Sequence, residues 1–383
     1  MKVISFIFLT LCCFSSNAQN DIYFPDRNVW EEKSASSFGF NQQMLDQAID
    51  SIIANEYVGP VDLRQAILKG FEREPYHKIL GPTKRRGGPA GMILKDGYII
   101  AQWGDTKKVD MTFSVTKSYL STVAGLAVDS GMIRSVDDKV SEYVWEDHFT
   151  GSHNSKITWA HLLNQSSAWF GQLWGGYDWN DRPPRDGDVH EWRKAALAEP
   201  GTEMEYNDVR VNLLAYSLLQ VWRQPLPQVL KERILEPIGA STTWRWFGYD
   251  NSWTTVDGVS MQSVSGGGHS GGGIFINTED HARFGLLCMN GGKWKDQQII
   301  SEKWLQAATT PSEPNPNYGY MWWLNKKGGE NRMNALSNTG FYAAGFGGNY
   351  IIVEPEDNIV IVLRWCDPSS ANRMLGMIKE AMN

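Results

Sequence analysis

Ser114 and Lys117 are the two residues of this sequence whose types and spacing most directly suggest covalent chemistry. A serine hydroxyl becomes a nucleophile only when a neighbouring base takes its proton. Residues three positions apart on a helix face the same side, so the lysine amine can reach the serine oxygen. Lysine ordinarily titrates near ~10.4, and burial lowers that value enough for the amine to act as a base. The pair therefore predicts a serine hydrolase in which Ser114 attacks a carbonyl and Lys117 moves the proton.

The sequence around this pair supports a catalytic role for it, whereas an S-x-x-K pattern alone often arises by chance. This S-x-x-K is the only one in the chain, it follows a predicted hairpin over 90–103, and it opens an amphipathic helix over about 114–130. The first turn of a helix leaves backbone N–H groups free. The N–H of Ser114 can therefore supply half of an oxyanion hole.

Two longer segments extend the pattern into a family resemblance. Residues 113–143, FSVTKSYLSTVAGLAVDSGMIRSVDDKVSEY, resemble the nucleophile helix and D-D-x-V continuation of the penicillin-binding-protein and class C β-lactamase superfamily, which includes D-alanyl-D-alanine carboxypeptidases, family VIII esterases and aminohexanoate-oligomer hydrolases. Residues 157–167, ITWAHLLNQSS, resemble its I-T-x-x-H-L-L-x-x-T-S-G segment. The similarity continues in patches to about residue 366. It implies an α/β fold of the β-lactamase/transpeptidase type, with an antiparallel sheet flanked by helices and an inserted, mostly helical subdomain.

A second element of that family is a Tyr-x-Asn whose tyrosine assists proton transfer. Tyr206 matches it best, because a P-G-T-E-M-E segment precedes it and a helix follows; Tyr249 also begins a Tyr-x-Asn but lacks this setting. Asp208 stands where the family has asparagine, and a carboxylate there would hold Lys117 in its protonated form. Asn207 is a candidate to donate its amide to the substrate.

The third family element is a strand with Lys-Thr-Gly or His-x-Gly, whose backbone completes the oxyanion hole. Residues 343–345 with Phe346 fit the spacing to the last strands, whereas 338–340 (NTG) is closer by letters. We favour the first, which places Gly345 and Phe346 at the substrate. In that alignment Ala343 replaces the cation that would meet a substrate carboxylate, which favours a neutral ester or amide.

Further candidates for substrate contact lie in two loops. His269 falls within SGGGHSGGG (265–273), which resembles a phosphate loop but lacks its G-K-[ST] ending and is interpreted as a tight loop. Trp169, Trp174 and Trp179 lie in a long loop over 169–192 that, by the resemblance, would overhang the site. Aromatic faces suit sugar rings or aliphatic chains, and a lid packed only on itself is the alternative.

Residues 1–18 are predicted to be a signal peptide. Lys2 precedes an apolar stretch over 3–14, and S-N-A at 16–18 supplies small residues for cleavage. A lipid anchor at Cys12 or Cys13 fits less well, so we expect a periplasmic or secreted protein. The rest, 19–383, is predicted to be one β-lactamase-like domain, with its α/β part at about 40–112 and 270–383 and the helical insertion at about 113–269.

Composition excludes several other classes. A formal net charge of −7 over 383 residues leaves no basic footprint for nucleic acid, and no stretch after the leader is long and apolar enough for a transmembrane helix. No H-E-x-x-H or zinc-type cysteine spacing is present, so we expect neither metal nor cofactor. Cys288 and Cys366 are either buried thiols or a disulfide.

The sequence therefore predicts an exported hydrolase that acts on a small-molecule ester or amide, with sugar and peptide derivatives among the candidates. β-Lactamase or carboxypeptidase activity is the first alternative, and a non-turnover penicillin-binding-type sensor is the second. Helices are predicted near 41–55, 209–222, 279–289 and 370–382, and strands near 350–353 and 359–365.

Overall fold

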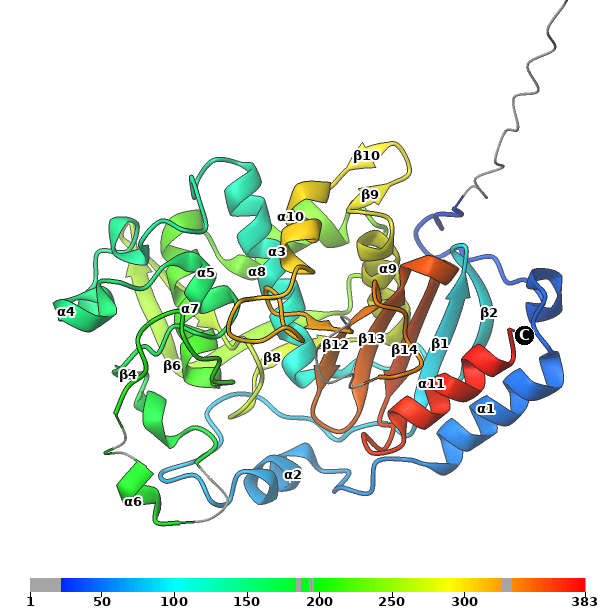
Figure 1. Ribbon diagram of the computed structural model, residues 1–383, viewed down its shortest axis with the longest axis horizontal. Helices are drawn as coiled ribbons and strands as arrows, with labels where there is room; N and C mark the ends of the chain where they lie inside the picture. The colour runs from blue at the N-terminus through cyan, green and yellow to red at the C-terminus, as the bar shows by residue number, and fades with distance from the viewer. Residues whose placement is uncertain (1–21, 184–186, 193, 195, 326–332, 383) are drawn as a thin grey trace, which may run out of the picture.

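A six-stranded antiparallel sheet joins the two ends of the chain (Figure 1). The structure is a computed structural model that describes residues 22–183, 187–192, 194, 196–325 and 333–382, so the predicted signal peptide lies outside the described residues. Within this sheet an early strand and a late strand pair directly, so that Ala90 lies opposite Arg364. The strands, in spatial order, are β11 (Trp323–Leu324), β12 (Phe341–Gly345), β13 (Asn349–Glu354), β14 (Ile359–Arg364), β1 (Ala90–Lys95) and β2 (Tyr98–Trp103).

Helices cover both faces of this sheet. The terminal helices α1 (Gln42–Ala54) and α11 (Ala371–Glu380) pack together on one face. On the other face α9 (Thr278–Met289) packs against β13 and β14, and α3 (Thr116–Asp129) is buried along nearly its whole length. Strand side chains alternate between these two apolar layers, as expected for a sheet covered on both sides. These elements confirm the predicted β-lactamase/transpeptidase-like fold.

The middle of the chain contains a second sheet that the sequence pattern did not predict. Its order is β3 (Asp110–Met111), β8 (Gly273–Ile276), β6 (Arg245–Val256) and β7 (Val259–Val264). β6 and β7 form a hairpin whose turn, Asp257-Gly258, has φ of 54° and 80°. An Asp-Gly pair is a strong hairpin signal, but residues 248–251 (GYDN) interrupt the strand-like pattern of β6. The predicted helical insertion thus contains this hairpin beside its helices.

The remaining elements are short and lie around these layers. α7 (Asp208–Trp222) is the longest of them and packs against α3. The other helices and turns are η1 (Ala35–Phe38), α2 (Leu63–Gly70), η2 (Phe113–Val115), η3 (Val140–Glu142), η4 (Asp147–Phe149), α4 (Gly151–Asn154), α5 (Trp159–Leu163), η5 (Asp178–Asn180), α6 (Val189–Trp192), α8 (Leu226–Leu230), the π-helical turn η6 (Lys231–Leu235), α10 (Glu302–Ala308) and η7 (Pro355–Asp357). Two small hairpins complete the list: β4 (Gln172–Leu173) with β5 (Gly176–Tyr177), and β9 (Lys293–Trp294) with β10 (Gln297–Gln298).

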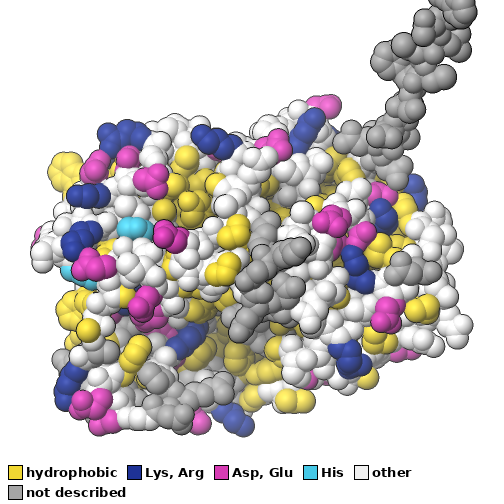
Figure 2. All heavy atoms as spheres, viewed as in Figure 1, with side chains coloured by type: hydrophobic (Ala, Val, Ile, Leu, Met, Phe, Trp, Pro, Cys, Tyr) yellow, Lys and Arg dark blue, Asp and Glu magenta, His cyan; other side chains and the backbone are white. Residues whose placement is uncertain are grey.

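Surface and core follow the composition. Figure 2 shows positive and negative side chains interspersed over the visible face, without a large patch of one sign. Cys288 and Cys366 are buried free thiols, the first of the two interpretations offered for them. Within the described ranges, no helix combines the length and apolar character needed to cross a bilayer.

Candidate active site

Ser114 lies in the short turn η2, directly ahead of α3. The preceding residue, Phe113, has a left-handed φ of 49°. Such a conformation costs a bulky residue about 1–3 kcal/mol and persists where surrounding contacts enforce it. Here the N–H of Thr112 donates to the Ile274 oxygen at 3.0 Å, and the N–H of Ile274 donates to Oγ1 of Thr116 at 3.1 Å. β8 therefore holds both sides of the turn, which places Ser114 at the edge of a cleft.

The side chain of Lys117 contacts both Ser114 and a carboxylate. Lys117 is only 1% exposed, and its Nζ lies 2.8 Å from Ser114 Oγ and 2.6 Å from Asp208 Oδ1. Burial is the largest single influence and lowers the pKa of Lys117, but the charge of Asp208, its hydrogen bond and the nearby Tyr206 together outweigh burial, so the pKa lies above its ordinary value. At neutral pH Lys117 is therefore an ammonium that donates hydrogen bonds to both oxygens.

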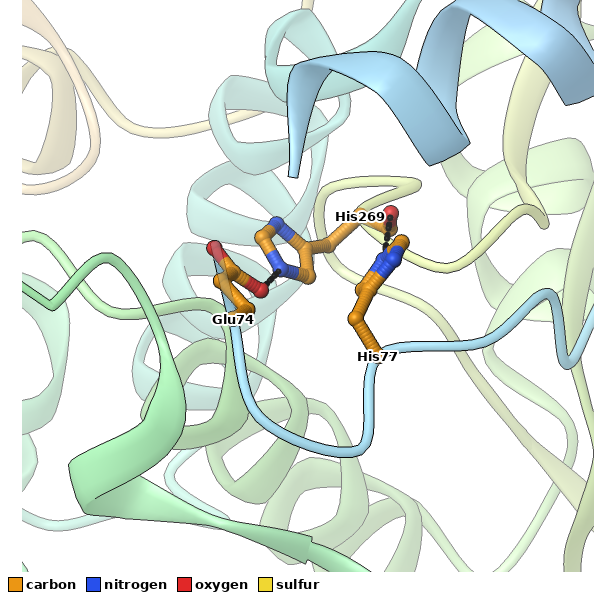
Figure 3. Close-up of side chains that lie close together, drawn as sticks. All are labelled: Glu74, His77 and His269. Carbon is orange, nitrogen blue, oxygen red and sulfur yellow. Dashed lines mark hydrogen bonds and ion pairs between the residues drawn. The ribbon is translucent and has the colours of Figure 1, made fainter. Parts of the chain in front are cut away.

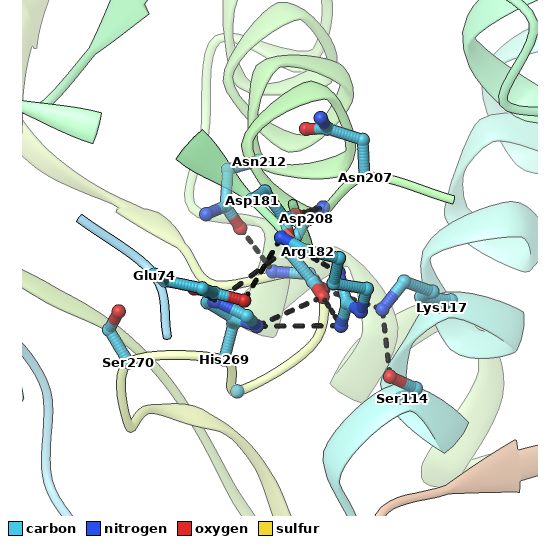
Figure 4. Close-up of polar contacts among 12 residues, drawn as sticks. Glu74, Ser114, Lys117, Asp181, Arg182, Asn207, Asp208, Asn212, His269 and Ser270 are labelled. Carbon is cyan, nitrogen blue, oxygen red and sulfur yellow. Dashed lines mark hydrogen bonds and ion pairs between the residues drawn. The ribbon is translucent and has the colours of Figure 1, made fainter. Parts of the chain in front are cut away.

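Asp208 is the centre of a buried cluster of charges (Figure 4). Its second carboxylate oxygen accepts from Nη2 of Arg182, and its backbone N–H donates to Asp181. Arg182 also donates from Nη1 to Asp181 at 2.6 Å. Burial would raise the pKa of Asp208, but Lys117 and Arg182 together hold that pKa well below its usual range. The carboxylate is consequently ionised at every pH at which the protein is expected to function.

His269 connects this cluster to Glu74 (Figures 3 and 4). Its Nε2 lies 2.5 Å from Oε2 of Glu74, and its Nδ1 lies 3.4 Å from Oδ2 of Asp208. Burial lowers the pKa of His269, whereas Asp181, Asp208 and Glu74 raise it, with a net increase to about 9. The imidazole is therefore protonated at neutral pH and donates from both nitrogens.

Two groups in this region have the composition of metal ligands: Glu74 with His77 and His269, and Asp181 with Asp208 and His269. In the first group, His77 bonds the backbone oxygen of His269 and Glu74 bonds its ring (Figure 3). In the second group, both carboxylates already pair with the cations described above. A histidine must lose its proton to ligate a metal. Hydrogen bonds and ion pairs thus account for both groups.

The glycine-rich loop reaches the Lys117–Asp208 pair through Gly267. A Cβ on this residue would collide with Oδ1 of Asp208 and Nζ of Lys117. The neighbouring Gly268, Gly271, Gly272 and Gly273 all have positive φ, which glycine adopts without strain. The run of glycines therefore lets the backbone pack directly on the ion pair and lets His269 point into the cluster.

The two candidate tyrosines lie in different surroundings. The ring of Tyr206 lines the same cleft as Ser114, stacks on Trp323 at a centroid distance of 5.8 Å, and lies 4.7 Å from Nζ of Lys117. Tyr249 is buried, and its hydroxyl bonds the amide of Asn212 and the backbone N–H of Ser270. Of the two, only Tyr206 therefore shares the Ser114 cleft.

The end of β12 lies against the backbone at Ser114. β11 pairs with β12 only at Phe341 and Tyr342, so the last part of β12 has no strand on that side. A Cβ on Gly345 would lie 3.3 Å from the Ser114 nitrogen and would collide with the Thr112 oxygen. Gly345 thus lets β12 approach the nucleophile closely. The other candidate segment, 338–340, lies before β12, with Asn338 and Thr339 exposed.

The cleft has a volume of about 420 Å³ and is lined by both polar and apolar residues, the apolar ones largely aromatic. Aromatic and polar residues contact each other within it: Phe71 lies against His269, and Trp323 stacks on Tyr206. The polar lining residues are Ser114, Arg182, Tyr206, Asp208, Gly267, His269 and Asn372; the others are Phe71, Phe113, Trp323, Met333, Tyr342, Ala344, Gly345, Phe346, Tyr350, Pro368 and Ala371.

Four of the predicted contact residues lie away from this cleft. Asn207 is fully buried; its amide donates to the Asp178 oxygen, its Oδ1 caps α7, and Figure 4 shows the side chain pointing away from Ser114. Trp169 is buried and bonds the His148 oxygen. Trp174 and Trp179 line two other cavities. The cleft therefore has none of the three predicted tryptophans.

Arg182 and Glu74 are the principal cleft and cluster residues that sequence reasoning missed. Neither belongs to a motif, and both lie far in sequence from Asp208 and His269. Arg182 follows two acidic residues of the Trp-rich loop, Asp178 and Asp181, and the second of them is its direct neighbour. The one available signal was this Asp-Arg pair within a loop expected to overhang the site.

Three comparisons connect this geometry with known proteins. The family model described as "Beta-lactamase" matches residues 82–370. A relative named "Putative D-alanyl-D-alanine carboxypeptidase" from Escherichia coli (strain K12) is 24% identical over 89% of this chain and 86% of its own length. The 6-aminohexanoate-dimer hydrolase of Paenarthrobacter ureafaciens is 24% identical over 73% of this chain and 74% of its own length. The solved structure of EstCE1, a hydrolase with promiscuous acyltransferase activity, matches with a TM-score of 0.58 at 16% identity, covering 89% of this chain and 98% of that one.

Proposed function

Because the chain belongs to the β-lactamase family, we propose that it is a serine hydrolase that cleaves an ester or amide through an acyl-enzyme on Ser114. The observation that supports this most directly is the 2.8 Å contact between Lys117 Nζ and Ser114 Oγ at the edge of the cleft. The relatives include proteins named "Putative D-alanyl-D-alanine carboxypeptidase" and "6-aminohexanoate-dimer hydrolase", and both names denote hydrolases.

In the proposed reaction, Ser114 attacks the substrate when Lys117 is a neutral amine. Lys117 then accepts the Ser114 proton as Oγ bonds to the substrate carbonyl carbon. When the bond from that carbon to the leaving group breaks, Tyr206 helps to return the proton to the leaving oxygen or nitrogen. Water then attacks the acyl-enzyme, releases the acid and restores the serine. Because Asp208 stabilises the ammonium form, the neutral amine is scarce at neutral pH.

The charge that develops on the carbonyl oxygen needs backbone donors. The N–H of Ser114 and the N–H groups at Gly345 and Phe346 are the proposed donors, since Gly345 lies against the Ser114 nitrogen. Preorganised donors of this kind stabilise a transition state by about 3–4 kcal/mol each.

The substrate is proposed to be uncharged near the scissile bond. Ala343 brings no cation, and its side chain packs in the core rather than in the cleft. Arg182 does line the cleft, but Asp181 and Asp208 already neutralise its charge. The pairing of Arg182 and the largely aromatic lining of the cleft together favour a substrate with an apolar acyl or leaving group.

We further propose that the protein is exported to the periplasm or secreted, on the basis of the leader-like residues 1–18.

The function is tested by the turnover of p-nitrophenyl acetate and butyrate beside a chromogenic cephalosporin, and by labelling with a fluorophosphonate. We expect ester turnover without cephalosporin turnover, and a phosphonate adduct that peptide mass analysis locates on Ser114. Cephalosporin turnover would instead support the β-lactamase alternative. An adduct on Ser114 without any turnover would support a sensor, which the protonated state of Lys117 also favours. Ester turnover by a protein that resists labelling would overturn the acyl-enzyme on Ser114.

Replacement of Gly267 by alanine is expected to lower kcat/KM for the ester at least tenfold. The added methyl group forces Lys117 and Asp208 apart, and overpacking of this kind costs about 1–3 kcal/mol of stability. Steady-state kinetics and thermal unfolding measure the two effects. Gly376→Ala on α11 is the control: its new Cβ meets nothing within 4 Å, so kcat/KM should be unchanged while the better helix former raises stability by about 0.5–1 kcal/mol. Equal kcat/KM for Gly267→Ala and wild type would show that the loop does not set the geometry of the ion pair.

A further inference from the structure

Arg364, the last residue of β14, is a buried cation that uses all three of its nitrogens. It is 2% exposed; Nε donates to Oδ1 of Asn349 at 2.7 Å, Nη1 to the Ile276 oxygen at 3.0 Å, and Nη2 to the Met111 oxygen at 3.0 Å. These acceptors are amide oxygens rather than carboxylates. Burying a cation costs several kcal/mol and is often no more stabilising than an apolar side chain of the same size. The position of its acceptors therefore suggests a role beyond stability.

Two of these acceptors are connected to the two backbone segments that carry the proposed oxyanion donors. Met111 ends β3, three residues before Ser114. Asn349 opens β13 and is fully buried, and its Nδ2 donates to the Phe346 oxygen at 2.7 Å. The guanidinium is thus joined to the nucleophile turn on one side and to the β12–β13 turn on the other.

These two segments meet at the place where the oxyanion is expected. Gly345 packs so closely on Thr112 and Ser114 that a single added carbon would collide with the Thr112 oxygen. The N–H groups on the two segments belong to different sheets, because β3 pairs with β8 and β12 pairs with β13. A group that bonds both sheets is needed to fix the distance between them.

We propose that Arg364, acting partly through Asn349, is a positioning residue that fixes the separation of the two backbone segments of the oxyanion hole. It does not touch the substrate, and its effect is exerted through Met111 and Phe346. This inference rests on the proposed serine hydrolase function, since it concerns the donors that face the Ser114 adduct. It adds two residues that the Ser114, Lys117 and Tyr206 motifs do not include.

Arg364→Met is expected to lower kcat for the p-nitrophenyl ester by about 10–100-fold with KM changed less than threefold, because misplaced donors weaken only the transition state. The inhibition constant of phenylboronic acid, whose tetrahedral adduct places an oxygen in the same hole, should weaken by a similar factor. Arg283→Met is the matched control. Arg283 is also a buried arginine that bonds three backbone oxygens, those of Pro25, Asp26 and Ile238, but it lies on α9 outside the cleft. It should lose stability and keep kcat.

Asn349→Asp tests the same inference if Arg364→Met fails to fold. The new carboxylate still accepts from Arg364 but repels the Phe346 oxygen, so kcat should fall about tenfold, with a smaller loss of stability than in Arg364→Met because the buried guanidinium keeps its acceptors. The inference is overturned if folded Arg364→Met and Asn349→Asp keep kcat within twofold of wild type, or if Arg283→Met loses as much kcat as Arg364→Met. A wild-type activity that survives Ser114→Ala would instead overturn the proposed function, so the two failures are distinguishable.

Discussion

Ser114→Ala is expected to lower kcat/KM for a p-nitrophenyl ester by about 10⁴-fold or more, the scale at which loss of a serine nucleophile acts in other hydrolases. The variant removes one oxygen and leaves Lys117 paired with Asp208 at 2.6 Å, so the buried charges stay satisfied. Its thermal unfolding midpoint should therefore stay close to that of the wild type. Initial rates over a range of substrate concentrations, with a fluorophosphonate labelling control, measure the effect.

Ser118→Ala provides the matched control for this substitution. Ser118 lies four residues after Ser114, in the first turn of α3, is buried, and donates to the Met321 oxygen at 2.8 Å. Its removal should cost about 1 kcal/mol of stability without affecting the rate. Comparable activity losses in the two variants would mean that α3, rather than the Ser114 oxygen, is the sensitive element.

Asp208→Asn is expected to move the acidic limb of the kcat/KM profile to lower pH. Burial is the largest influence on Lys117 and lowers its pKa, and the Asp208 charge is the largest influence that raises it. Without that charge the pKa of Lys117 falls, and each unit of decrease gives about ten times more neutral amine at a given pH below it. At pH 7 the variant should thus turn over ester faster than the wild type, provided that it is assayed well below its unfolding temperature.

The same substitution should destabilise the protein by about 3 kcal/mol, because breaking a buried ion pair leaves its partners under-compensated. The ion pairs of Arg182 with Asp181 and of His269 with Glu74 remain in the variant, which limits the loss of stability. Asp280→Asn is the control: it neutralises another buried carboxylate, one that bonds Ser241 outside the cleft. It should lose stability without a shift of the pH profile. An unshifted profile in Asp208→Asn would exclude the protonation of Lys117 as the origin of the acidic limb.

The sequence was sufficient for the fold class, through the family resemblance, and for the contact between Ser114 and Lys117, but it did not reveal the sheet formed by β3, β8, β6 and β7. The two residues lie three positions apart where η2 leads into α3, so their contact does not depend on distant segments of the chain. The same holds for the outer helices and for the strands β13 and β14, whose patterns agree with their burial. The local pattern therefore carries information wherever partners are near in sequence.

The charge cluster could not be predicted in the same way, because its members meet only through the tertiary structure. Arg182 and Asp208 come from a loop and a helix terminus, and Glu74 comes from the segment after α2. The Trp-rich loop shows a limit of composition as a signal. The loop's tryptophans were compatible both with substrate contact and with a lid packed on itself, and Trp169 is buried and donates its indole N–H to the His148 oxygen.

The pairing of β1 with β14 has a consequence for how the chain acquires its structure. Residue 90 lies beside residue 364, so the central sheet cannot close until nearly the whole chain has been synthesised. Folds dominated by such distant pairings form slowly, since a long loop must be ordered before any strand contact compensates for it. During synthesis the N-terminal hairpin consequently remains without its partner strand. The main sheet of this topology therefore closes only after synthesis, and the proposed export would be served by a chain that has not yet taken that step.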